Sequence, residues 1–146
     1  MLPEIHIKVI PFKAHRKNIG GQVDDYWVDK KGILQIRISD LNSASLEFML
    51  LIHALSEAVL CMIRGIKFSS IDEFDRQFEE QVRGGLYRED EEPGDDIAAP
   101  YKREHFFATN IERLLAAELG INWGYYERIL NDLYAPKHSG QWDNTR

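Results

Sequence analysis

The feature that most constrains the fold is a long apolar stretch from Asn42 to Arg64. Its few polar residues include His53, Glu57 and Arg64, which fall within a sector of about 40° on a helix that turns about 100° per residue. Apolar side chains cover most of the remaining circumference, and a helix of this kind is buried in a protein core. The narrow polar stripe therefore either reaches water through a gap in the packing or lines a small site.

Short alternating stretches before this helix predict a small sheet. Residues 4–12 have the period of a half-exposed strand, and residues 25–28 and 33–39 flank a turn, as in a β-hairpin. The last strand is expected to bury Leu34, Ile36 and Ile38 and to expose Gln35, Arg37 and Ser39. Strands followed only by helices indicate an α+β fold, with an N-terminal three-stranded antiparallel sheet and about four helices.

Capping signals divide the second part of the chain into helices. Asn42 or Ser43 is suited to cap the central helix, and a Ser-Ile-Asp-Glu capping box predicts a second helix over residues 70–83. A third helix is expected over residues 101–119, after a proline and before a glycine, and a fourth over residues 123–134. With 146 residues, we expect one domain over residues 1–135 and a flexible tail over residues 136–146.

Composition narrows the classes of function. The net charge of −6 argues against phosphate-backbone binding, so no nucleic acid partner is expected. The single cysteine, Cys61, permits no internal disulfide and is expected to pack inertly in the core. No basic and apolar leader opens the chain, so we expect a cytoplasmic protein that does not enter a membrane. The acidic residues between 84 and 100 are interpreted as a solvated loop, in preference to a dedicated cation site.

A helical pair of polar residues suggests chemistry. His53 and Glu57 stand at i and i+4, the spacing at which two side chains of one helix can reach the same metal ion. An ion pair or a hydrogen-bonded core histidine produces the same spacing, so the pair by itself is a weak signal. Because an isolated buried carboxylate costs several kcal/mol, Glu57 must meet either water or a partner outside its helix.

Two other helices strengthen this signal. His105 and Glu112 share one face of the third helix, and Asp75 lies on the second helix one turn after Asp72. If the helices pack together, four of these side chains surround one divalent cation, for which zinc is the expected metal: His53, Glu57, Asp75 and His105. A solvated stripe with a locally bonded histidine stays open as the alternative.

A set of motifs between Tyr26 and Tyr126 carries a family resemblance. It comprises a Tyr-Trp hairpin, an ILQIRIS strand, a His-x-x-x-Glu-Ala-x-x-Cys helix, Pro-Gly-Asp and Ala-Pro-Tyr in the loop, and Glu-His-x-x-Ala-Thr. The pattern resembles small bacterial and phage proteins that look like minimal relatives of zincin-type metallopeptidases. The resemblance implies that the ILQIRIS strand lies beside the His53 helix, that His53 and Glu57 are metal ligands, and that His105 or Asp75 supplies a third.

The chain departs from that pattern at the general-base position, which Ala54 occupies. Without a carboxylate there, a zinc-bound water lacks its usual proton acceptor, a loss on the order of 10²–10⁴ in rate. Glu104 and Glu112 are the candidate catalytic substitutes, with Asp75 as a further one. A scaffold that has lost peptidase activity is equally compatible with the sequence.

Three functional hypotheses follow. The first is a metal-dependent hydrolase relative with a substrate that the residues do not define. The second is a non-catalytic interaction or assembly protein, of phage association, with aromatic contact anchors at Trp27, Trp123, Tyr125 and Tyr126. The third, ranked last, is a nucleotide pyrophosphohydrolase that uses Asp72 and Asp75, because the strands and histidines do not fit that class. A homodimer that buries part of the last helix is compatible with all three.

Overall fold

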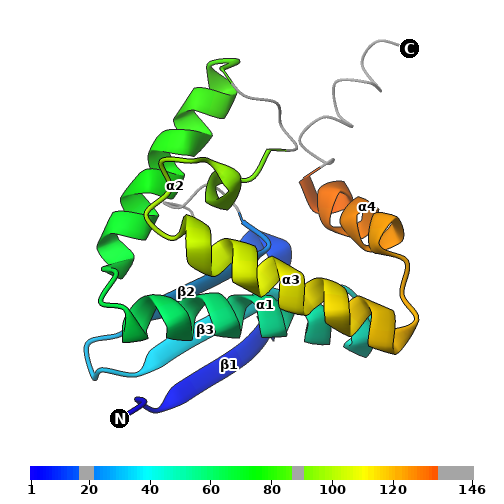
Figure 1. Cartoon of the computed structure of the whole chain (residues 1–146), viewed down its shortest axis with the longest axis horizontal. Helices are drawn as coiled ribbons and strands as arrows, with labels where there is room; N and C mark the ends of the chain where they lie inside the picture. The colour runs from blue at the N-terminus through cyan, green and yellow to red at the C-terminus, as the bar shows by residue number, and fades with distance from the viewer. Residues whose placement is uncertain (17–21, 87–90, 135–146) are drawn as a thin grey trace.

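The computed structural model describes residues 1–16, 22–86 and 91–134. Its elements follow in the order β1 (Ile5–Ile10), η1 (Phe12–Ala14), β2 (Asp24–Val28), β3 (Leu34–Ser39), α1 (Ala44–Ile63), α2 (Phe68–Arg83), η3 (Pro93–Asp95), α3 (Lys102–Leu119) and α4 (Trp123–Tyr134), where η marks a short 3-10 helix (Figure 1). The predicted α+β class, with three strands followed by four α-helices, is confirmed for the described residues. The expected tail at 136–146 lies outside them.

The three strands form one mixed sheet in the order β1-β3-β2. The hairpin prediction is confirmed, since β2 pairs antiparallel with β3 and Tyr26 lies opposite Ile36. The prediction of a purely antiparallel sheet is wrong, because β1 pairs parallel with β3 and places Ile7 opposite Ile36. A tight turn fixes the direction of β2 relative to β3, whereas no short turn joins β1 to β3, and alternation in the sequence says nothing about direction.

The central strand β3 is buried on both faces. Its aliphatic residues are buried as expected, but so are Gln35 and Ser39, for which exposure was the wrong prediction. Both polar side chains have partners: Gln35 Nε2 donates to Asp29 at 2.9 Å, and Ser39 Oγ donates to the Val23 carbonyl at 2.7 Å. A central strand leaves little of either face open to water, so its polar residues are retained where such partners exist.

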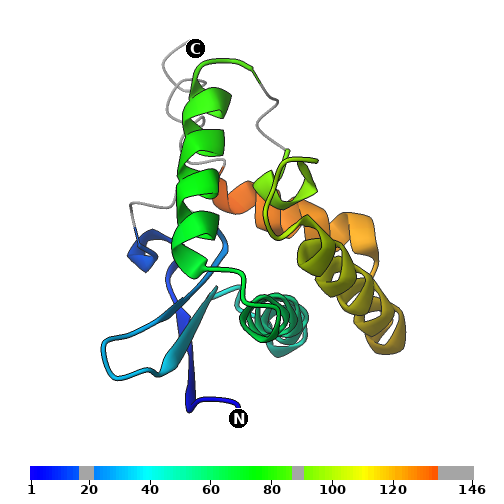
Figure 2. The ribbon, with the colours of Figure 1, turned by 60° about the vertical axis from the view of Figure 1, so that its left-hand side comes forward.

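Helix α1 is the middle layer of the molecule. It lies across the sheet and beneath α3 in Figure 1, and Figure 2 shows it almost end-on between these two layers. Ser43 caps it as predicted, with its side chain accepting from the Leu46 N–H. Ala54, Ala58 and Cys61 are fully buried, and burial raises the pKa of the Cys61 thiol to about 12. The cysteine therefore stays protonated and packs in the core, as expected.

The boundaries of the other helices test the capping signals. Helix α2 begins at Phe68 after Lys67, so the proposed capping box lies inside the helix and that prediction is wrong. Gly120 ends α3 in the left-handed conformation at φ 68°, which glycine adopts without strain. The Asn122 side chain accepts from the Tyr125 N–H at 2.9 Å and so caps α4, as expected.

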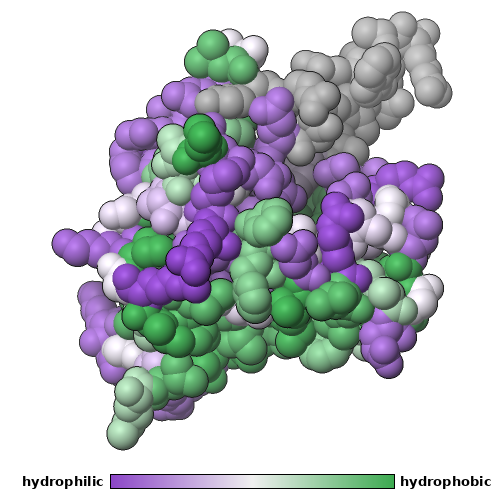
Figure 3. Space-filling model, viewed as in Figure 1, coloured by the Kyte–Doolittle hydropathy of each residue, from purple (hydrophilic) through white to green (hydrophobic). Residues whose placement is uncertain are grey.

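One face of the molecule carries an apolar band. In Figure 3 hydrophobic side chains gather over α1 and α3, where a groove of about 340 Å³ is lined by Phe48, Ile52, Ile111, Leu114, Leu115 and Glu118. Helix α1 is also long and apolar enough to cross a membrane by length and composition. That test is equally passed by the core helices of proteins that stay in water, and α1 packs between the sheet and α3.

Candidate metal centre

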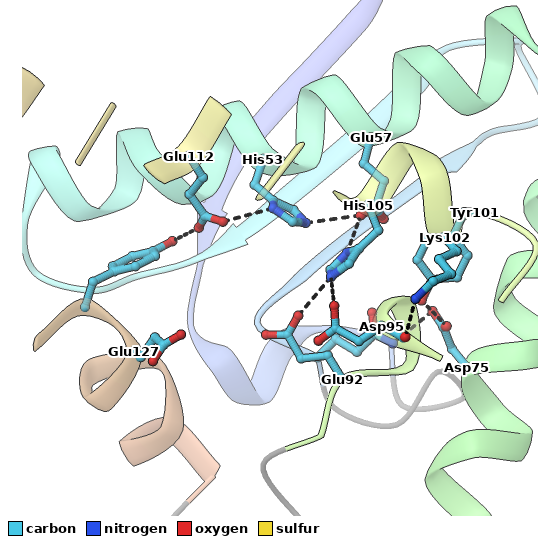
Figure 4. A network of polar contacts seen from close by, with 12 residues as sticks. His53, Glu57, Asp75, Glu92, Asp95, Tyr101, Lys102, His105, Glu112 and Glu127 are labelled. Carbon is cyan, nitrogen blue, oxygen red and sulfur yellow. Dashed lines mark hydrogen bonds and ion pairs between the residues drawn. The ribbon is translucent and has the colours of Figure 1, made fainter. Parts of the chain in front are cut away.

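Helices α1 and α3 bring three of the predicted ligands together. His53 Nε2 lies 3.1 Å from Glu57 Oε2, and His105 Nδ1 lies 2.8 Å from the same oxygen. One ligand atom from each residue lies within 4.8 Å of the other two, and all three residues are buried. Figure 4 shows His53 and Glu57 pointing from α1 toward His105. His53 and Glu57 are therefore buried in a polar cluster and do not form a solvated stripe.

The outer nitrogen of His53 is held by Glu112. His53 Nδ1 lies 3.0 Å from Glu112 Oε1, and the second carboxylate oxygen of Glu112 accepts a hydrogen bond from the Tyr126 hydroxyl (Figure 4). Glu112 and Tyr126 are both buried. Glu112 is thus bonded to the candidate ligand His53 and is not itself in the three-residue cluster. Tyr126, which the interaction-protein hypothesis named as a contact anchor, lies in the core.

The outer nitrogen of His105 is held by the turn η3. His105 Nε2 lies 3.1 Å from Glu92 Oε2 and 3.4 Å from Asp95 Oδ1. Both carboxylates belong to the acidic segment that the sequence suggested was only a solvated loop. Their side chains are 60% and 72% exposed, yet they reach an imidazole that is 8% exposed. The loop interpretation is right for their exposure and misses their contact with the site.

Glu57 is the central carboxylate of the cluster. Its Oε1 accepts from the Tyr26 hydroxyl at 2.7 Å, while its Oε2 faces both imidazoles. Burial acts to raise the pKa of Glu57, but hydrogen bonds from His105 and His53 outweigh burial and hold this pKa well below its usual value. Glu57 is therefore ionised, and its partners lie outside its own helix except for His53.

Both imidazoles hold their protons strongly when no metal is present. Burial acts to lower the pKa of His53, but its hydrogen bonds to Glu112 and Glu57 prevail and raise the pKa well above 6.5. The pKa of His105 is raised in the same way, against burial, by Asp95, Glu57 and Glu92. Each ring nitrogen thus carries an N–H that faces a carboxylate. A cation bound between the rings and Glu57 would replace the two inner protons.

Two of the predicted site residues have other partners. Asp75 accepts from the Tyr101 hydroxyl at 2.5 Å and from Gln22 Nε2 at 2.9 Å, and it does not belong to the ligand cluster. Glu104 is buried and lies 2.5 Å from the Arg64 guanidinium. Asp75, predicted as a metal ligand, and Glu104, predicted as a catalytic residue, therefore have partners outside the His53, Glu57 and His105 cluster.

The pair of aspartates behind the pyrophosphohydrolase hypothesis is divided as well. Asp72 contacts the Arg16 guanidinium at 3.3 Å, whereas Asp75 contacts Tyr101 and Gln22. Two carboxylates with separate neutral and cationic partners do not present the shared face that a magnesium diphosphate site requires.

Several site residues were not anticipated from the sequence. Tyr26 comes from β2, and Glu92 and Asp95 come from η3. Asp24, at the start of β2, has a pKa raised to about 7, first by burial and then by carboxylates that include Glu57, while His53 acts against this rise. The Pro-Gly pair marks a turn shortly before the histidine helix, but nothing in the sequence places that turn against His105.

The general-base position faces the core. Ala54 is fully buried in the cluster that contains Ile36 and Ala58, between α1 and the sheet. Ala54, which stands where the resemblance expects a general base, is therefore an apolar core residue beside the candidate ligands His53 and Glu57. Comparison of the chain with protein-family models, with curated proteins and with solved structures found no match.

Proposed function

We propose that the protein binds one divalent transition-metal ion through His53, Glu57 and His105, and that it is a zincin-like hydrolase relative. The observation that carries this proposal is the double support of the two histidines. Each ring turns one nitrogen toward Glu57 Oε2 and has its other nitrogen held by a separate carboxylate. Metal-binding histidines characteristically have such an outer carboxylate, which fixes the ring and its tautomer.

The donor set favours zinc. Imidazole nitrogen and a carboxylate oxygen are common zinc ligands, and three protein ligands leave a fourth position for water or substrate. Calcium and magnesium prefer oxygen ligands only, so two histidines argue against them. Burial of the three residues further favours an ion that binds tightly with few ligands.

The residues around the site define what chemistry it supports. A zinc ion bound there would polarise a carbonyl group and lower the pKa of a bound water. Glu112 holds His53 in its ligand orientation, and Tyr26 fixes the second oxygen of Glu57. Because Ala54 offers no proton acceptor, we expect hydrolysis to be slower than in a complete site by about 10²–10⁴.

The charge around the site favours an uncharged or cationic substrate group. Carboxylates from three elements surround the cluster, namely Asp24, Glu92, Asp95 and Glu112. Apart from the two imidazoles, the cation among these contacts is Lys102, which donates to the Asp95 carbonyl. This excess of negative charge repels phosphoryl groups more than peptide or ester carbonyls. We therefore propose a carbonyl substrate.

Elemental analysis tests the proposal. The untagged protein is loaded with zinc, dialysed against metal-free buffer and compared with His53→Ala and Glu57→Ala, with Glu104→Gln as a matched buried control. The proposal expects about one equivalent of zinc in the wild type and the control and none in the two ligand variants. A wild type that takes up no metal when zinc is added back contradicts it.

A non-catalytic interaction protein is the second candidate. The observation that favours it is the apolar residue at the base position together with the exposed apolar groove over α1 and α3. The two candidates differ in turnover. Zinc-loaded protein that cleaves an ester or peptide, and loses this activity in Glu57→Ala, supports the hydrolase, whereas a bound ion without turnover supports the second candidate.

A further inference from the structure

We propose that the turn η3 is a strap that positions the ligand His105, with Glu92 and Asp95 as positioning residues. The inference rests on the proposed metal centre and goes beyond it, because it assigns a role to a surface turn. Figure 4 shows both carboxylates reaching from the turn to the same nitrogen of the His105 ring. The strap thus places two exposed carboxylates in contact with a buried imidazole.

Close packing by Gly94 is the first observation. A Cβ added at Gly94 would lie 2.4 Å from His105 Cγ and 2.6 Å from His105 Nδ1. Such distances do not occur between real side-chain atoms, so a glycine is required for the backbone to lie on the ring. The turn thus covers one face of His105 and limits its rotation.

Hydrogen bonds within the turn are the second observation. The Asp95 N–H donates to the Glu92 carbonyl at 3.1 Å, which closes the turn and brings the two carboxylates to one side. Lys102 Nζ, from the first turn of α3, donates to the Asp95 carbonyl at 2.5 Å. The strap is therefore fastened to the same helix that carries His105.

These contacts determine which nitrogen of the His105 ring faces the proposed ion. The carboxylates of Glu92 and Asp95 contact Nε2, so the ring is oriented with Nδ1 toward Glu57, where that nitrogen can bind an ion. Without these acceptors Nε2 loses its polar contacts with the turn, and the packing of Gly94 is the remaining contact of the turn with the ring. Glu92 and Asp95 thus act on the ion only through the orientation and tautomer of His105.

A graded set of variants tests this role. Glu92→Ala with Asp95→Ala removes both acceptors, whereas Glu92→Gln with Asp95→Asn keeps neutral ones. We expect zinc affinity to fall by about 10–100-fold in the first and by less in the second, mainly through faster dissociation. The absorption spectrum of cobalt-loaded protein should change in the same order. Glu127→Gln, which removes an exposed carboxylate that accepts from Trp123, should leave both readouts unchanged.

Gly94→Ala provides an independent variant that keeps both carboxylates. Its methyl group displaces the turn from the ring, so zinc dissociation should accelerate although the charges are intact. If wild type and all strap variants bind one zinc ion with equal affinity and spectra, the strap is overturned and the metal centre stands. Two ions in the wild type and one in the double alanine variant also overturn it, because the carboxylates would then be ligands. A wild type without zinc overturns the metal centre itself.

Discussion

The two histidines of the candidate centre, His53 and His105, make the same kinds of contact, but their outer carboxylates differ in burial. Each places one nitrogen against Glu57 Oε2 and the other against an outer carboxylate. The outer carboxylate of His53 is Glu112, which lies in the core on α3 and is bonded to Tyr126. The outer carboxylates of His105 lie on the exposed turn η3.

Because of this difference in burial, loss of Glu112 should affect the stability of the fold, whereas loss of Glu92 and Asp95 should affect mainly the orientation of His105. An ion pair in the core is costly to break, about 3–5 kcal/mol, because the remaining charge stays buried. A pair with an exposed carboxylate contributes about 0–1 kcal/mol, because water replaces the lost partner. The His53 half of the centre should therefore be fixed by the fold, whereas the His105 half should be adjustable from the surface.

Glu112→Ala should have the largest effect on stability. It leaves the His53 imidazolium and the Tyr126 hydroxyl without their buried partner, so the free energy of unfolding of metal-free protein should fall by about 3–5 kcal/mol. Chemical denaturation at neutral pH measures the loss. Glu112→Gln, which keeps an acceptor for His53, serves as the control and should lose less. A loss below about 1 kcal/mol in the alanine variant would show that this half is not fixed by the pair.

Asp75→Asn extends the comparison to a buried carboxyl that faces no histidine. Burial raises the pKa of Asp75 to about 7 from 3.8, against hydrogen bonds from Tyr101 and Gln22, so the folded state binds the proton more tightly than the unfolded state. Its favourable contribution is present at low pH and is lost as the pH rises through 7. The variant should gain about 1–3 kcal/mol over wild type at pH ~8, and little at pH ~4. Denaturation curves at both pH values measure this, and equal differences would contradict it.

The double alanine variant of Glu92 and Asp95 should have the smallest effect on stability. Both side chains are exposed, so the free energy of unfolding of metal-free protein should change by less than about 1 kcal/mol. The same denaturation series measures it beside Glu112→Ala. If both variants lose a similar amount of unfolding free energy, the His53 and His105 sides of the proposed centre do not differ in their contribution to stability.

The sequence predicted those parts of the molecule that depend on local periodicity. The i, i+4 spacing placed His53 and Glu57 on one face of α1, and the shared face of His105 and Glu112 on α3 is present in the structure. The β2–β3 hairpin and the ends of α1, α3 and α4 follow from turn and capping residues, whereas α2 begins before its predicted capping box. Periodicity assigns a residue to a face of its own helix or strand, and these predictions need no other information.

The remaining features depend on contacts between distant elements. The helical face of Asp75 was predicted from its spacing, but its side chain contacts Tyr101 and not the two histidines. The position of α2 relative to α1 depends on packing between helices, which periodicity within α2 does not predict. The parallel direction of β1 depends on the path of a long connection. Glu92 and Asp95 lie in a turn without a periodic pattern, so only their distance from His105 reveals them. Long-range geometry was the missing information in each case.

A crystal structure of the zinc-loaded protein, with anomalous scattering measured at the zinc absorption edge, tests the central claim most directly. The account predicts one strong anomalous peak within about 2.0–2.2 Å of His53 Nε2, Glu57 Oε2 and His105 Nδ1. Glu112 and the carboxylates of η3 should then remain bonded to the outer ring nitrogens. A peak between Glu92 and Asp95 instead, or no peak at the three buried ligands, would contradict the assignment of this centre.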